Sequence, residues 1–161
     1  MLKKLFKKTE KVTEEDVFSP VNGKVVDLSV TPDPTFAEKL LGDGVAIEPS
    51  DGEFVAPVNG KVVNLFPTKH AIGIESEAGV EYLIHIGLDT VTLDGKGFNA
   101  HVKQGDQVKI GDPLVTVDLD YVANHANTIT PFVITSDIDT IDKVADQEVK
   151  KGETKVMTVH L

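Results

Sequence analysis

The feature that most constrains the fold of this chain is the shortness of its apolar runs. From Val17 onward, short β-branched and aliphatic stretches alternate with Gly, Pro, Asn and Asp, as at residues 23–28, 44–48 and 80–86. Turn residues at such close intervals are typical of antiparallel sheets rather than of β-α-β units. The sequence therefore predicts an all-β fold, an antiparallel β-sandwich or barrel-like domain.

Three further segments add detail to this fold. Residues 119–126 predict a short helix, and residues 36–41 predict a helical turn inside a longer loop. Residues 102–114 contain two Gly-Asp pairs, which favour tight turns. We interpret these turns as structural rather than catalytic.

The chain also contains an internal repeat. The sequence Pro-Val-Asn-Gly-Lys-Val-Val occurs at residues 20–26 and again at residues 57–63. Asn-Gly favours a tight turn, and the Val-Val pair that follows it favours the start of a strand. Two copies of one turn-strand unit are therefore expected at related places in the fold.

Composition excludes several classes of function. The chain has 161 residues, no cysteine and a net charge of −10. These values fit one domain of ordinary size, without disulfides or thiol catalysis, and an acidic chain repels nucleic acid. No apolar run has the length of a transmembrane helix, and the basic N-terminus lacks the apolar core of a signal peptide, so we expect a cytoplasmic protein.

Residues 1–16 are predicted to form a flexible basic amphipathic tail, and residues 17–161 a single β domain. The tail begins at Met1 with a segment that ends at Lys8 and in which Leu2, Leu5 and Phe6 lie between lysines. On a helix, the apolar and basic side chains of this segment would fall on opposite sides. The segment is either a weak contact for an anionic membrane surface or a solvated tail, and the sequence leaves both open.

Two of the five histidines lie in an informative arrangement. His70 and His85 flank a predicted hairpin whose loop, residues 76–79, ends in glycine. A four-residue loop places His70 directly opposite His85, with Ile72 and Leu83 on the same face as an apolar floor. A three-residue loop would shift the register by one residue and place the two rings on opposite faces.

Adjacent imidazoles suit nucleophilic chemistry, because a neutral imidazole nitrogen is a nucleophile near neutral pH. A zinc site is an alternative, but two histidines are an incomplete ligand set, and spacing alone places neither Asp89 nor Asp94 beside them. The other three histidines have no comparable partner. We interpret them as surface or structural residues: His101, His125 and His160.

Residues 85–98, His-Ile-Gly-Leu-Asp-Thr-Val-Thr-Leu-Asp-Gly-Lys-Gly-Phe, strongly resemble the active-site signature of glucose-type enzyme IIA. This family is the phosphocarrier of the bacterial sugar phosphotransferase system. Residues 36–47, 55–60 and 68–71 also resemble the family, and the resemblance runs from about Phe18 to the C-terminus.

The resemblance implies an antiparallel β-sandwich and a phosphotransferase component that needs no cofactor. It implies that His85 carries the phosphoryl group on Nε2. The donor would be the phosphorylated carrier HPr, and the acceptor the cysteine of a sugar-specific IIB domain. His70 matches the second histidine of the family, which contacts the phosphoryl group. Thr68 matches the threonine that orients this second histidine, and Gly87 the glycine whose carbonyl holds Nδ1 of the carrier.

The resemblance also implies a docking surface for partner proteins. Asp33 and Asp89 match carboxylates that meet a basic residue of HPr, although Asp33 could equally be a turn residue between two prolines. Six apolar residues match the docking ring, and several of them could instead fill the core: Phe36, Leu40, Leu41, Phe66, Leu83 and Val91. Gly73, Pro34 and Thr35 depart from the family pattern and leave partner choice open.

Two other functions compete with this interpretation, and a third is compatible with it. A lysostaphin-type zinc endopeptidase requires a His-x-His pair, which this sequence lacks. A biotinyl or lipoyl carrier requires a lysine at a hairpin tip, whereas Lys24 and Lys61 lie at predicted strand starts. Regulation of partner proteins according to phosphorylation state is compatible with the carrier function and stays open.

Overall fold

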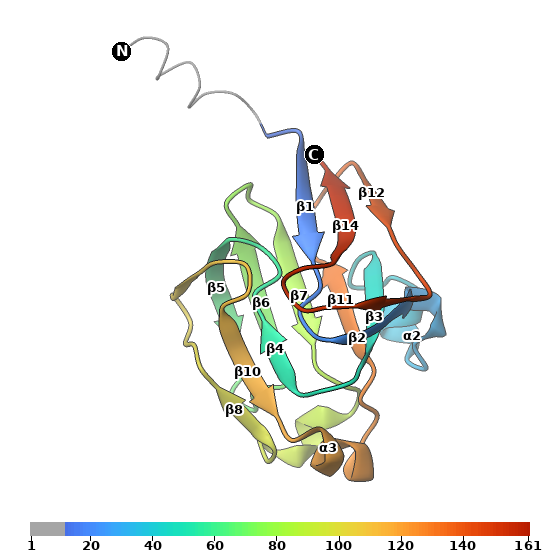
Figure 1. Cartoon of the computed structure of the whole chain (residues 1–161), viewed down its shortest axis with the longest axis vertical. Coiled ribbons are helices and arrows are strands. Elements are labelled where there is room, and N and C mark those ends of the chain that lie inside the picture. The colour runs from blue at the N-terminus through green and yellow to red at the C-terminus, as the bar shows by residue number, and fades with distance from the viewer. Residues whose placement is uncertain (1–11) are drawn as a thin grey trace.

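Antiparallel strand pairing builds nearly all the regular structure of the chain (Figure 1). The computed structural model describes residues 12–161. The largest sheet has eight strands in the order β13-β2-β3-β11-β7-β6-β5-β9. In chain order its strands are β2 (Gly23–Asp27), β3 (Gly44–Pro49), β5 (Gly60–Leu65), β6 (Ala71–Ser76), β7 (Glu81–His85), β9 (Gln107–Val108), β11 (Thr130–Ile134) and β13 (Gln147–Val149).

Two three-stranded sheets complete the sandwich. One has the order β4-β10-β8 and the other the order β1-β14-β12. Their strands are β1 (Glu14–Phe18), β4 (Glu53–Val55), β8 (Phe98–Ala100), β10 (Pro113–Val117), β12 (Thr140–Lys143) and β14 (Lys155–His160). The predicted antiparallel β-sandwich is therefore confirmed.

The apolar runs of the large sheet are continuous because several strands are buried on both faces. In β3, Val45 and Ile47 enter the main core, whereas Ala46 between them enters a second apolar cluster. β11 is divided in the same way, with Phe132 in the main core and Val133 in the second cluster. The second cluster thus lies on the outer face of the large sheet, where side chains of alternate parity gather.

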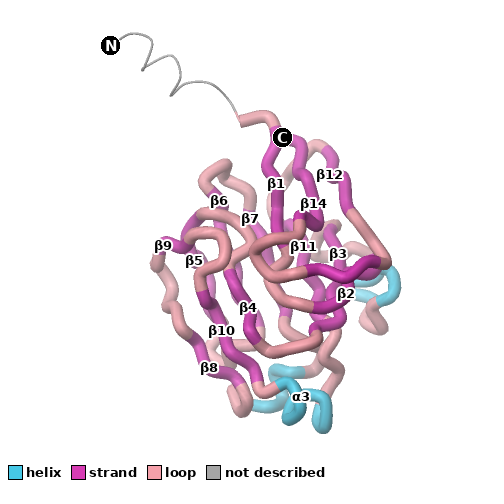
Figure 2. The backbone as a smooth tube through the Cα atoms, in the orientation of Figure 1, coloured by secondary structure: helices cyan, strands magenta, loops and turns pink. Residues whose placement is uncertain are grey.

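Short helices lie at the margins of the sheets (Figure 2). They are η1 (Leu28–Val30), α2 (Pro34–Ala37), η2 (Thr90–Leu93) and α3 (Leu119–His125). The predicted helix at residues 119–126 is confirmed as α3, whose first turn is capped by the Asp118 carboxylate. α2 begins two residues before the predicted turn because Asp33 caps it and Pro34 occupies a first-turn position.

The two copies of the repeat occupy equivalent places, as predicted. The first copy leads into β2 and the second into β5, and the copies exchange backbone hydrogen bonds. Phe18 N donates to Pro57 O at 3.0 Å, and Val55 N donates to Pro20 O at 2.7 Å. Phe18 and Val55 each lie two residues before the proline that begins their own copy of the repeat. The two hydrogen bonds are therefore reciprocal.

Glycine is required at the same place in both copies. A Cβ atom on Gly23 would lie 2.1 Å from the Glu48 carbonyl oxygen, and one on Gly60 would lie 2.1 Å from the Glu75 carbonyl oxygen. Each glycine therefore permits the close approach of the returning strand, β3 in the first copy and β6 in the second.

The N-terminal boundary of the domain differs from the predicted one. β1 begins at Glu14 and pairs with β14, so Glu14, Glu15 and Asp16 belong to a sheet rather than to a tail. The predicted membrane-contact segment, residues 1–8, lies outside the described residues. Within residues 12–161, no helix is long and apolar enough to span a membrane.

Candidate active site

His70 and His85 meet at one end of the large sheet. His85 is the last residue of β7, and His70 immediately precedes β6, the neighbouring strand. Their ring centroids are 5.1 Å apart, and the ring planes are 81° apart. The predicted proximity of the two imidazoles is therefore confirmed.

The predicted register, in contrast, is wrong by one residue. His85 pairs with Ala71 rather than with His70, and Glu75 pairs with Glu81 rather than with Val80. β6 extends through Ser76, so the loop of the hairpin has one residue fewer than predicted. Gly79 ends this loop with φ of +88°, the conformation expected for it.

The rings still meet because His70 lies outside the regular strand. Lys69 before it adopts a left-handed conformation with φ of +63°, and His70 itself is in a bend. Its side chain therefore does not follow the alternation that begins at Ala71. The predicted apolar floor is not formed, since Ile72 enters the main core whereas Leu83 packs against the second cluster.

The tautomer of His85 is fixed by the turn that follows it. Its Nδ1 lies 2.7 Å from the Gly87 carbonyl oxygen. A carbonyl only accepts hydrogen bonds, so Nδ1 carries the proton and Nε2 of the neutral ring keeps its lone pair. The geometry thus presents Nε2 as the nucleophilic atom.

Glycine is the only residue type that fits at position 87 in this turn. It has φ of +75°, and a Cβ atom there would lie 2.6 Å from both the Asn127 carbonyl oxygen and Thr90 Cγ2. The fully buried Thr90 donates its hydroxyl hydrogen to the Ile86 carbonyl at 2.7 Å. Leu88 N donates to Asn127 O at 2.8 Å, so this amide is not free to bind a phosphoryl group.

Sequence reasoning missed the roles of Thr90 and Asn127 in this turn. Thr90 lies within the signature stretch and could have been found there. Asn127 comes from the segment before β11, and nothing local in the sequence signals its contact with residue 88.

His70 is buried and is oriented by Thr68. Only 4% of its surface is exposed, and its Nδ1 lies 2.5 Å from Thr68 Oγ1. The half-buried Phe66 ring packs edge-on against the imidazole at a centroid distance of 5.5 Å. Burial, aided by the neighbouring His85, lowers the pKa of His70 to about 4.

His85 is also held in its neutral form. Burial lowers its pKa, and this effect outweighs the hydrogen bond to Gly87 and the charges of Asp33 and Asp89, which act in the opposite direction. Both imidazoles are thus neutral at physiological pH, the protonation state that a nitrogen nucleophile requires.

Asp33 and Asp89 line one cleft beside His85, together with Pro32, Pro34, Leu88 and Asn127. Asp33 also accepts a hydrogen bond from Thr35 N at 2.9 Å, so it is a turn residue as well as a cleft residue. Asp89 is exposed and adopts a left-handed conformation with φ of +61°. The cleft therefore presents two carboxylates close to the nucleophile.

Three of the six predicted docking residues are exposed, and the other three, Phe36, Phe66 and Leu83, are buried or partly buried. Leu40, Leu41 and Val91 are exposed by 70%, 44% and 55%, respectively. Phe36 is buried in the second cluster, with its ring 5.0 Å from that of His85, and Leu83 packs on the same cluster. The exposed residues are thus available to a partner protein, whereas Phe36 and Phe66 pack against the two imidazoles.

The remaining histidines have local partners. His101 Nε2 lies 2.6 Å from Thr116 Oγ1, and His125 Nδ1 lies 2.8 Å from the Tyr121 carbonyl. His160 Nε2 lies 2.8 Å from Asp142 Oδ2. Among residues 12–161, no group of three or more His, Asp or Glu side chains is placed to hold a metal ion.

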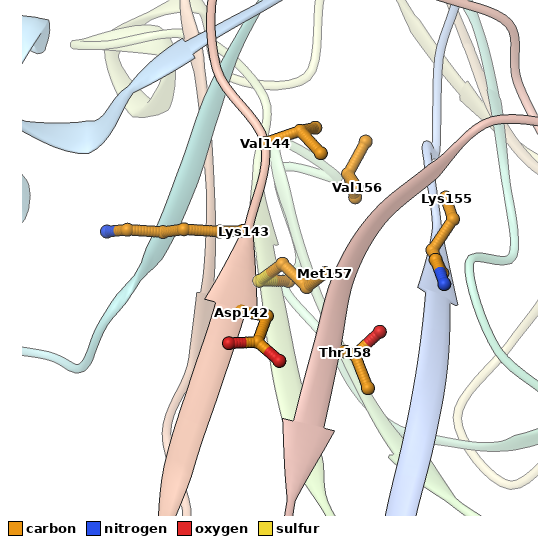
Figure 3. A pocket seen from close by; sticks show the side chains of 7 residues that line it. All are labelled: Asp142, Lys143, Val144, Lys155, Val156, Met157 and Thr158. Carbon is orange, nitrogen blue, oxygen red and sulfur yellow. The ribbon is translucent and has the colours of Figure 1, made fainter.

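A second pocket lies between β12 and β14 and contains no residue of the histidine site (Figure 3). It is lined by Asp142, Lys143, Val144, Lys155, Val156, Met157 and Thr158.

Comparisons with known proteins agree with this fold and site. Residues 15–140 match the family model described as phosphoenolpyruvate-dependent sugar phosphotransferase system, EIIA 1. The chain belongs to this family. It is a phosphotransferase component, a phosphocarrier that works between HPr and a IIB domain.

Individual relatives are similar over nearly the whole chain. A glucose-specific EIIA component from Halalkalibacterium halodurans is 49% identical over 99% of this chain and 98% of its own length. The EIICBA component from Staphylococcus carnosus, also named glucose-specific, is 51% identical over 88% of this chain, which corresponds to 21% of its own length. The solved structure of glucose permease IIA from Mycoplasma capricolum superposes with a TM-score of 0.87 at 44% identity, covering 91% of this chain and 96% of that one.

Proposed function

We propose that His85 carries the phosphoryl group on Nε2, accepting it from phospho-HPr and passing it to the cysteine of a IIB domain. The bond between His85 Nδ1 and the Gly87 carbonyl is the observation that carries this proposal. It fixes the proton on Nδ1 and leaves the lone pair on Nε2.

Each transfer is a displacement at phosphorus. Nε2 of His85 forms a bond to phosphorus while the bond to the imidazole nitrogen of HPr breaks, and that nitrogen regains its lone pair. In the second transfer, the thiolate of IIB forms the bond to phosphorus and the bond to His85 breaks. Such transfers need in-line positioning and stabilisation of charge on the phosphoryl oxygens.

His70 supplies this stabilisation in our proposal. When Thr68 donates its hydroxyl hydrogen to Nδ1, the proton of the neutral ring resides on Nε2, which can then donate to a phosphoryl oxygen. The low pKa of His70 keeps its ring neutral. A neutral donor stabilises the phosphoryl oxygens without holding the phosphoryl group on His85 as strongly as a cation would. The Gly87 and Asp89 amides are candidate further donors.

The docking surface combines charge with apolar contacts. In our proposal, Asp33 and Asp89, which line one cleft, meet a basic residue of HPr, and the exposed Leu40, Leu41 and Val91 form an apolar rim. Exposed apolar side chains beside a polar cleft are typical of partner sites. Phe36 and Phe66 support the two imidazoles, and Leu83 packs on the second cluster beside Phe36.

We further propose that the acceptor IIB domain belongs to a glucose permease and meets this carrier at the cytoplasmic face of the membrane. The relatives named glucose-specific support this substrate, and the EIICBA relative carries a IIA region within a longer permease chain. Residues 1–8 would contact anionic lipid and keep the carrier near the permease. Binding of the full chain to anionic vesicles, compared with a chain lacking these residues, tests this last point.

The central experiment is phosphorylation from phosphoenolpyruvate with the first phosphotransferase enzyme and HPr. The wild type should take up acid-labile phosphate and pass it to a glucose IIB domain, whereas His85→Ala should take up none. His125→Ala is the control, because His125 is an exposed histidine outside the site. Phosphate on His85→Ala would contradict the proposal.

A further inference from the structure

The backbone hydrogen bonds of the loop that carries Leu40 and Leu41 join near neighbours in the sequence, as from Lys39 N to Phe36 O at 3.0 Å. α2 has four residues, and beyond it the loop turns at Lys39, which has φ of +61°. Leu40 N donates to Thr35 O at 3.1 Å, and Gly42 N donates to Lys39 O at 3.2 Å. A segment of this kind needs fixed ends to present exposed side chains in one position.

The C-terminal end of the loop is fixed at Asp43 from another part of the chain. Lys143 Nζ, on β12, donates to Asp43 Oδ1 at 2.8 Å and to the Gly44 carbonyl at 3.0 Å. Figure 3 shows the Lys143 side chain extending away from the other labelled side chains of its pocket. Lys39 Nζ is a weaker partner of the same carboxylate, at 3.6 Å.

The Lys143–Asp43 pair differs from an ordinary surface ion pair. The two side chains are 22% and 33% exposed, whereas both members of the Lys155–Asp16 pair are 54% exposed and 3.8 Å apart. Two acceptors on adjacent residues also fix the ammonium more closely than one does. Although partial burial acts in the opposite direction, hydrogen bonds from Lys143 and Gly44 hold the pKa of Asp43 below its usual value.

The same loop reaches the nucleophile at its other end. Phe36 is buried beneath the loop, and its ring lies 5.0 Å from that of His85. Leu40 and Leu41 therefore lie between two anchors, the Phe36 ring in the second cluster and the Asp43 carboxylate.

We propose that Lys143 is a positioning residue for phosphoryl transfer, which holds the end of the docking loop so that Leu40 and Leu41 meet the partner protein. This inference rests on the docking surface proposed above. Lys143 acts through Asp43 and Gly44 and touches none of the reacting atoms.

The test measures KM and kcat for phosphoryl uptake from phospho-HPr. Lys143→Met should raise KM roughly fivefold with kcat within twofold of wild type, because loop position affects encounter and not the imidazole chemistry. Lys143→Arg, which can still donate to both acceptors, should restore most of the KM. Lys155→Met, on the adjacent strand β14, is the matched control and should leave KM unchanged.

Two further variants, Asp43→Asn and Leu40→Ser, keep the test decisive if Lys143→Met folds poorly. Asp43→Asn removes the other partner of the pair, and the double variant with Lys143→Met should raise KM no further than either single variant. An unchanged KM in both single variants, while Leu40→Ser does raise KM, would overturn the inference and leave the docking surface intact. An unchanged KM in Leu40→Ser as well would instead contradict the docking surface.

Discussion

The two copies of the repeat lead into hairpins that start alike and end differently. β2 and β3 are joined by a long connection, residues 28–43, whereas β5 and β6 are joined by a short one, residues 66–70. Each connection places one phenylalanine against one histidine, Phe36 on His85 and Phe66 on His70. Equivalent scaffolds thus bring two different loops to one site.

The difference in length explains the division of tasks. The short connection is closed by its own backbone, with Lys69 N donating to Phe66 O at 2.7 Å and Phe66 N donating to Ala71 O at 3.1 Å. Such a turn can hold the His70 ring rigidly. The long connection also has backbone hydrogen bonds within itself, but the Lys143 side chain from β12 holds its end at Asp43. This connection exposes Leu40 and Leu41. In our proposal, the short loop holds His70, which supports the chemistry at His85, and the long loop recognises the partner.

Replacing His70 tests the short connection of this comparison and should have the largest effect on phosphoryl transfer. His70→Ala keeps the His85 nucleophile, so uptake of phosphate from HPr should still be detectable. Transfer onward to IIB should fall by roughly 10²–10³-fold, the usual effect of losing one donor to a developing charge. Rapid-quench transfer from the phosphorylated protein to IIB measures it, and equal onward rates in variant and wild type would contradict the role of His70.

The same histidine should also leave a signature in stability. Because the pKa of His70 is about 4 in the folded state and ordinary in the unfolded state, the unfolded chain binds more protons between these values. The free energy of unfolding should therefore fall as the pH drops from 6.5 toward 4, by about 2–3 kcal/mol from this group.

Urea unfolding at pH 7 and pH 4.5 measures this loss. In His70→Asn the loss should be smaller by that amount, since the other titrating groups are unchanged. Parallel pH dependence in the two proteins would show that His70 titrates normally in the folded state.

Replacing Leu40 breaks the recognition half. Leu40→Ser should raise the KM for phospho-HPr by about tenfold with little change in kcat or in the free energy of unfolding, because the side chain is 70% exposed. Val12→Ser is the control, as Val12 is 55% exposed and precedes β1, a strand of the β1-β14-β12 sheet. A lower kcat at unchanged KM would assign Leu40 to the chemistry instead.

The scaffold shared by the two hairpins should show the smallest effect on transfer. Asn22 Nδ2 donates to Asp51 Oδ2 and its Oδ1 accepts from Lys151 N, whereas Asn59 Oδ1 accepts only from Ile110 N among the described contacts. Asn22→Ala should lower the free energy of unfolding by about 2 kcal/mol and Asn59→Ala by about 1 kcal/mol. Both variants should transfer phosphate like the wild type, and a loss of transfer at retained stability would show that the scaffold is not neutral.

Much of this molecule follows from local sequence. The antiparallel class, the α3 helix and the equivalent repeat copies follow from turn residues and short apolar runs, which act over a few residues. The histidine pair was predicted through a register that is wrong, and it forms because Lys69 adopts a left-handed conformation that releases His70 from the strand. A choice between loops that differ by one residue involves small energies that residue type alone does not decide.

The sequence did not predict the long-range contacts, because turn residues and short apolar runs act over only a few residues. Asn127 closes the turn after His85, and Lys143 holds Asp43, yet each lies far along the chain from the group it contacts. The roles of Thr68 and Gly87 were predicted only through resemblance to the family, and the distances of 2.5 Å and 2.7 Å give those roles a geometric basis here.

The most direct test of the account is to locate the phosphate on the phosphorylated chain. Nitrogen-detected NMR of the ¹⁵N-histidine-labelled protein, after phosphorylation through HPr, distinguishes the two nitrogens of each ring. We expect a single modified nitrogen, Nε2 of His85, with Nδ1 still hydrogen-bonded to Gly87. Phosphate on Nδ1 of His85, or on His70, would contradict the central claim that the turn after β7 selects the reactive atom.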